Sequence, residues 1–129
     1  KDTIAAVKPP LPVTQRTNKT VRTLQVNVKT ITLNVYDNAT VDGDTVSIYY
    51  DGKLLVNKKG LSVKPIELTI ELDEHSAKHE LILFAENLGS IPPNTALIVV
   101  TAGEKRYELF ASSSLQENAV LVFEYKPGD

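Results

Sequence analysis

The chain has 129 residues, enough for one domain with a single two-layer core. Its 14 basic and 16 acidic residues give a net charge of −2 and form no cationic block, so nucleic acid is not an expected partner. No apolar run approaches the roughly 20 residues of a membrane span, and the absence of cysteine excludes disulfides, thiol nucleophiles and thiolate metal sites.

The first 20 residues have the composition of a linker. Pro9, Pro10 and Pro12 favour extended backbone, and the polar stretch 14–20 has no apolar period. We therefore expect an extended proline-containing segment over 1–20 and a folded domain over 21–127. Because the sequence shows no signal peptide and no methionine, we expect a mature chain or a segment of a longer protein, with an intracellular chain as the alternative.

From residue 21 onward, apolar residues recur at every second position, which is the period of a half-buried strand. The clearest example is 65–72, where every second residue from Ile66 is apolar. Segment 80–85 is apolar on both faces, which is typical of a central strand, and 21–28 is a candidate edge strand. The predicted strands are 21–28, 31–36, 45–50, 53–57, 65–72, 80–85, 96–101, 105–112 and 119–125.

Turn signals separate these segments. Asp51-Gly52 between two alternating runs is a strong hairpin signal, and 102–104 is a second turn. Eight or nine short strands with no convincing helix predict an all-β fold, namely a two-layer antiparallel β-sandwich that is Ig-like or jelly-roll-like. An up-and-down barrel is the alternative. We expect the core to include Ile31, Leu33, Val46, Ile48, Ile66, Leu68, Ile70, Leu81, Leu83, Ile98 and Leu121.

An acidic loop follows the second predicted strand. Asp37, Asn38, Asp42 and Asp44 supply oxygen atoms within eight residues, and Ca²⁺ prefers six to eight hard oxygen ligands. Asp37, Asp42 and Asp44 are therefore candidate calcium ligands. The simpler interpretation, which we favour, is that these side chains form Asx-turns with local N–H groups.

Two histidines four residues apart are a second candidate metal site. His75 and His79 have the spacing of a helical zinc pair, but they lie between two predicted strands, and Ser76 stands where a metalloprotease motif has glutamate. A solvated turn is the preferred interpretation. The serines at 112–114 lack a nucleophile-elbow motif, and no pair of carboxylates is singled out by its spacing, so we expect no enzymatic activity.

The five tyrosines divide by strand parity. Tyr36 and Tyr49 fall on the outward side of their predicted strands, whereas Tyr50, Tyr107 and Tyr125 fall inward. Exposed aromatic rings can stack on sugars, so Tyr36 and Tyr49 are candidate ligand-binding residues. The alternative is that both rings support cross-strand pairs.

Two longer segments, 33–53 and 80–96, carry a family resemblance. The first contains the hairpin Asp42-Gly-Asp-Thr-Val-Ser-Ile-Tyr-Tyr-Asp-Gly52, and the second contains Ala85-Glu-Asn-Leu-Gly-Ser-Ile-Pro-Pro-Asn-Thr-Ala96. Together they resemble a β-sandwich accessory module of secreted and cell-surface bacterial proteins of the Bacteroidetes type, over roughly 21–126. The resemblance implies an extracellular domain joined by linkers to other domains, and it implies no catalytic residues.

We accordingly predict a non-catalytic recognition module located outside the cell or on its surface. A glycan is the expected ligand, with calcium as the candidate cofactor. The alternative function is a structural spacer or a protein-interaction domain within a larger surface protein.

Overall fold

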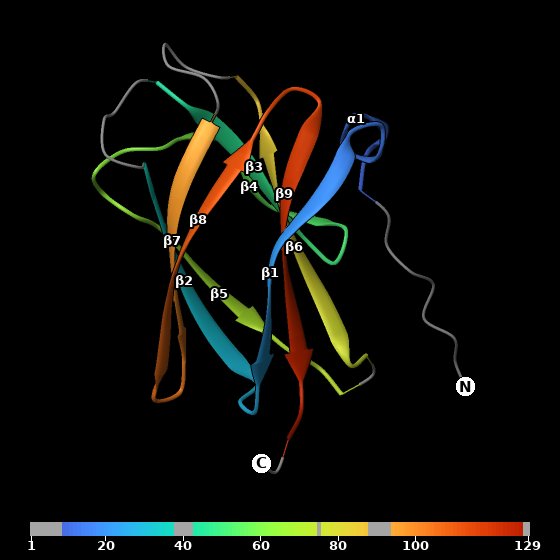
Figure 1. Ribbon diagram of the computed structural model, residues 1–129, viewed down its shortest axis with the longest axis vertical. Coiled ribbons are helices and arrows are strands. Elements are labelled where there is room, and N and C mark those ends of the chain that lie inside the picture. Colours follow the sequence, from blue (N-terminus) through green and yellow to red (C-terminus); the bar gives the residue numbers. More distant parts are fainter. Residues whose placement is uncertain (1–8, 38–42, 75, 88–93, 128–129) are drawn as a thin grey trace.

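The computed structural model describes residues 9–37, 43–74, 76–87 and 94–127. Nine strands form two packed sheets, which confirms the predicted all-β sandwich (Figure 1). Sheet A has the strand order β1–β9–β6–β3–β4, and sheet B has the order β5–β2–β7–β8. The elements are α1 (Leu11–Thr14), β1 (Thr17–Val26), β2 (Thr30–Asp37), β3 (Thr45–Tyr50), β4 (Lys53–Gly60), β5 (Ile66–Glu71), β6 (Lys78–Ala85), β7 (Asn94–Ala102), β8 (Lys105–Ser113) and β9 (Glu117–Tyr125).

Most connections between consecutive strands cross from one sheet to the other. Only the hairpins β3–β4 and β7–β8 stay within one sheet, and every other pair of consecutive strands lies in opposite sheets. Neighbouring strands are antiparallel except β1 and β9, which run parallel from Thr17 beside Glu117 to Val26 beside Tyr125. As expected from the sequence, β1 is an edge strand and β6 is the middle strand of sheet A.

The core lies between the inward faces of the sheets, where the period-two pattern places it. All eleven residues expected in the core are buried, and they belong to one continuous cluster. The predicted hairpin is also present, with Asp51 and Gly52 at φ values of 47° and 87° between β3 and β4. These positive values explain the Asp-Gly pair, because glycine and aspartate accept the left-handed conformation more readily than most residues.

The domain begins earlier than residue 21, the boundary predicted from the sequence. Residues 9–16 contain the single helical turn α1, and β1 begins at Thr17. The first half of β1 is exposed on both faces, so it shows no apolar alternation and reads as a linker. Among the described residues, no helix is long and apolar enough to cross a membrane.

Helix α1 covers part of the outer face of sheet A. Val13 is only 2% exposed and packs on an apolar group that is separate from the main core. The side-chain amide of Asn118 donates a hydrogen bond of 3.0 Å to the Val13 carbonyl. We call this group the outer cluster; it consists of Val13, Tyr49, Ile82, Phe84 and Val120.

Arg16 fastens the same segment to the sheet. Its Nη1 donates to the carbonyls of Ala85 (2.8 Å) and Ser114 (3.1 Å). Its guanidinium lies 3.7 Å from the centre of the Phe84 ring. Burial lowers the pKa of Arg16, and the nearby carboxylate of Glu86 partly offsets that effect. Residues 9–16 are therefore an integral part of the fold.

Two asparagines hold the ends of the connection between β6 and β7. The side-chain oxygen of Asn87 accepts a hydrogen bond from the Thr45 backbone N–H at 3.0 Å. Asn94 is buried, and its amide donates to the carbonyls of Thr45 (3.3 Å) and Asn87 (3.2 Å). Both asparagines thus bind backbone groups, as turn chemistry predicts. Residues 88–93 lie outside the described residues.

Candidate functional site

The outer face of sheet B carries an apolar row that crosses three neighbouring strands. Tyr36 on β2 pairs with Leu97 on β7, and Leu97 pairs in turn with Phe110 on β8. All three residues alternate with inward-facing core residues, so their side chains share the outer face. We call this set the sheet B row: Tyr36, Leu97 and Phe110.

The sheet B row is accessible to solvent. Phe110 is 61% exposed and is the only aromatic residue among the exposed large hydrophobic residues of the described chain. Tyr36 and Leu97 are half-buried. A phenylalanine ring in this position contributes little to the core, and exposed apolar groups that gather in one place commonly mark an interaction site.

Polar side chains border the row on both sides. On one side Thr95 and Ser112 are cross-strand partners whose hydroxyl oxygens lie 3.0 Å apart. On the other side the next row of the face runs from Asn34 through Val99 to Glu108. Hydroxyl, amide and carboxylate groups therefore surround a flat apolar strip.

Asn34 is unusual for its position. It lies in the middle of β2, an interior strand, where asparagine is disfavoured. Its buried side-chain oxygen Oδ1 has no hydrogen-bond partner in the part of the chain that the structure describes. Natural sequences tend to break local rules of this kind at functional sites.

The two tyrosines predicted as ligand-binding residues lie on opposite faces of the sandwich. Tyr36 belongs to the sheet B row, whereas Tyr49 points to the outer face of sheet A. Strand alternation places Tyr49 outward, but Tyr49 belongs to the outer cluster and is only 8% exposed. Its ring meets Phe84 edge-on at a centroid distance of 6.5 Å. The two candidate rings therefore lie on different faces, and the expectation that Tyr49 is an exposed stacking ring is wrong.

Phe110 was missed by the sequence analysis because only tyrosines were considered as stacking residues. Strand alternation in 105–112 does carry the signal, since Phe110 falls on the opposite face from Leu109 and Ala111. Its alignment with Tyr36 depends on the register of β2, β7 and β8, which the local pattern does not contain.

Two of the three candidate calcium ligands, Asp37 and Asp44, lie at one end of the sandwich. Asp37 ends β2, and its backbone N–H donates to the Ser62 carbonyl at 3.0 Å. Asp44 is buried before β3, and its carbonyl accepts from the Leu61 N–H at 2.8 Å. Asp42 lies outside the described residues, within which no group of three or more His, Asp or Glu could hold a metal ion. Calcium binding stays a prediction.

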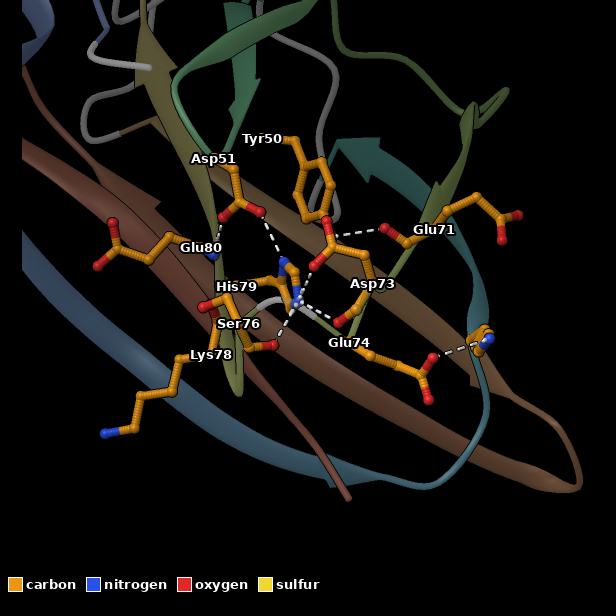
Figure 2. A network of polar contacts seen from close by, with 10 residues as sticks. Tyr50, Asp51, Glu71, Asp73, Glu74, Ser76, Lys78, His79 and Glu80 are labelled. Carbon is orange, nitrogen blue, oxygen red and sulfur yellow. Dashed lines mark hydrogen bonds and ion pairs between the residues drawn. The ribbon is translucent and has the colours of Figure 1, made fainter. Parts of the chain in front are cut away.

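A polar network ties the tip of the β3–β4 hairpin to the start of β6 (Figure 2). His79 is 2% exposed, with Nδ1 2.6 Å from the Asp51 carboxylate. Its Nε2 faces the carbonyls of Ser76 (3.1 Å) and Asp73 (3.3 Å). The other Asp51 carboxylate oxygen accepts from the Glu80 backbone N–H at 2.8 Å.

The prediction that His79 lies in a solvated turn is therefore wrong. Among the described residues, oxygen acceptors lie within hydrogen-bond distance of both ring nitrogens, so the nitrogen that carries the proton donates to one of them. The burial of His79 and its contacts with Asp51, Asp73 and Ser76 indicate a structural role. His75, the other member of the suggested zinc pair, lies outside the described residues.

Tyr50 completes this network and provides a test in alkaline solution. Its ring stacks on His79 at 5.8 Å, and its hydroxyl donates to the Glu71 carbonyl at 2.9 Å. Burial raises the pKa of Tyr50 well above its ordinary value, and the carboxylates of Asp51, Asp73 and Glu71 add to the effect. In the unfolded chain a tyrosine ionises near pH ~10. The folded state thus keeps a neutral phenol where the unfolded state would ionise.

We expect the protein to lose stability as the pH rises above about 10, because proton release by Tyr50 then favours the unfolded state. Tyr50→Phe removes this titration, so its melting temperature should fall less steeply between about pH 9.5 and 11.5. Below pH ~9 the two proteins should differ only by a constant offset from the lost hydroxyl bond. Melting curves across this range measure both effects, and parallel curves for the two proteins would contradict the prediction.

Comparison of the chain with protein-family models, with curated proteins and with solved structures returned no match. The resemblance to a bacterial accessory module accordingly rests on the two sequence segments alone.

Proposed function

We propose that this domain is a non-catalytic recognition module of an extracellular or cell-surface protein, and that it binds a glycan on the outer face of sheet B. The observation that carries the proposal is the alignment of Tyr36, Leu97 and Phe110 across three adjacent strands. Aromatic rings offer a flat apolar surface that suits the C–H faces of sugars, and the tyrosine hydroxyl adds a polar group.

The polar residues beside the row suit the same ligand. Sugar hydroxyls need partners that both donate and accept hydrogen bonds. The hydroxyls of Thr95 and Ser112 can do both, and the amide nitrogen of Asn34 can donate. The surface thus combines the two kinds of contact that a glycan requires.

The direct test measures retention of the domain by immobilised glycans. Phe110→Ala removes the most exposed ring of the row and should weaken retention at least about tenfold, which corresponds to the loss of roughly 1.4 kcal/mol of binding energy. Leu54→Ala is the matched control, because Leu54 is 47% exposed but belongs to β4 in the other sheet. Its retention should equal that of the wild-type domain. Equal retention of all three proteins, or none on any glycan, would favour the spacer or protein-interaction function instead.

Asn34→Val separates a binding role from a structural one. Valine suits an interior strand, and the change removes a buried oxygen that lacks a partner, so we expect the free energy of unfolding to rise by about 0.5–1.5 kcal/mol. If the amide contacts the glycan, retention should fall in the same variant. Chemical denaturation and retention assays on one preparation measure both, and a stabilised variant with unchanged retention would remove Asn34 from the site.

A further inference from the structure

We infer that the outer face of sheet B takes an uncharged glycan and rejects an anionic one. This inference rests on the proposed function and specifies its ligand class. The inference is drawn from the net negative charge of this face and from the position of its carboxylates beside the sheet B row.

The charged residues at the outward positions of sheet B are mainly acidic. Those of β5 include Glu67 and Glu71, and those of β8 include Glu108. Arg106 is the single basic residue at an outward position of these four strands, and its Nη1 lies 2.6 Å from the Glu108 carboxylate. Three carboxylates and one guanidinium leave a net charge of −2 on this face, with its one cation already paired.

Two of these carboxylates lie beside the sheet B row. Glu67 pairs with Asn34, and Glu108 pairs with Val99, so they occupy the two ends of the adjacent row. Rows on one face of a sheet are two residues apart along the strands, about 6.6 Å. With neighbouring strands about 4.8 Å apart, Leu97 lies about 8 Å from Glu108 and about 12 Å from Glu67 along the sheet. An anionic group on a sugar stacked against Leu97 would therefore come within about a Debye length (8–10 Å) of the Glu108 position, and Glu67 would add a weaker repulsion.

A separate group of lysines lies on the other sheet. Lys53, Lys58 and Lys59 belong to β4, the edge strand of sheet A, and none lies on sheet B. Anionic polymers that bind these lysines would do so independently of Phe110. The difference in retention between the wild-type domain and Phe110→Ala therefore measures binding by the sheet B face alone.

Matched neutral and anionic forms of the same polymers provide the test. Affinity electrophoresis would use hydroxyethylcellulose, dextran and pullulan, each beside its carboxymethylated form at a similar degree of polymerisation. We expect Phe110-dependent retention by a neutral polymer and at least about tenfold weaker Phe110-dependent retention by its carboxymethylated partner at low salt. Added sodium chloride should narrow the difference, because it screens the repulsion.

The double variant Glu67→Gln/Glu108→Gln removes both carboxylates and frees Arg106. The ratio of its retention by the carboxymethylated polymer to its retention by the neutral polymer should rise towards one. Equal Phe110-dependent retention of both forms by the wild type, or an unchanged ratio in the double variant, overturns the charge selection and leaves the proposed function standing. Neutral retention that does not depend on Phe110, or no neutral retention at all, instead overturns the proposed function.

Discussion

Phe123→Ala is expected to lower the free energy of unfolding by about 3–5 kcal/mol, the range measured for large-to-small changes at buried aromatic positions. Phe123 lies on β9 between Leu24 of β1 and His79 of β6, and it has no exposed surface. Removal of its ring would leave a cavity in the main core that the surrounding strands can close only in part. Urea denaturation measures the change directly.

Phe110→Ala is the matched control for this substitution, because the same atoms are removed from an exposed site. We expect its free energy of unfolding to stay within about 0.5 kcal/mol of the wild-type value. The two phenylalanines would then separate stability from recognition, with Phe123 governing the first and Phe110 the second. A large loss of stability in the Phe110 variant would show that this ring supports the sheet.

Removal of residues 1–16 should have the second large effect. The truncation deletes Val13 from the outer cluster, where burial of a valine side chain contributes about 1.5–3 kcal/mol. It also deletes the charged hydrogen bonds from Arg16 to the Ala85 and Ser114 carbonyls, for which about 1.5–3 kcal/mol is typical. The partly exposed surface of Arg16 reduces the sum, so we expect a loss of about 3–5 kcal/mol.

A shorter truncation controls for this experiment. Deletion of residues 1–8 leaves both Val13 and Arg16 in place and should change the free energy of unfolding by no more than about 0.5 kcal/mol. Chemical denaturation of the two truncated proteins gives the comparison. If both behave like the full chain, the segment before β1 does not contribute to stability, and the sequence-based boundary at residue 21 would describe the stable domain better.

The period-two pattern predicted most of the fold because it records burial on one face. It located all nine strands and the central position of β6, since each depends on local alternation between apolar and polar residues. It failed for 17–20, where the first part of β1 pairs with β9 through backbone groups and buries neither face. A strand without a buried face leaves no periodic trace in its sequence.

The candidate site was predicted less well, for a related reason. Parity correctly assigned Tyr36 and Tyr49 to outward faces. It could not show that they belong to different sheets, or that Tyr49 joins a buried cluster that also contains Val13, a residue 36 positions earlier in the sequence. Likewise, the partner of His79 is Asp51, 28 residues away at the tip of another hairpin. Sheet membership and coverage depend on long-range packing, which short windows of sequence do not encode.

The parallel pairing of β1 and β9 has a mechanical consequence. Because the first and last strands run side by side in the same direction, the chain leads into one end of the sandwich and away from the other (Figure 1). Tension between Thr17 and Tyr125 would slide these strands past each other and load their evenly spaced hydrogen bonds together. Bonds sheared together resist force better than bonds opened one after another. A domain with this geometry is suited to resist a pull between its first and last strands while both sheets stay folded.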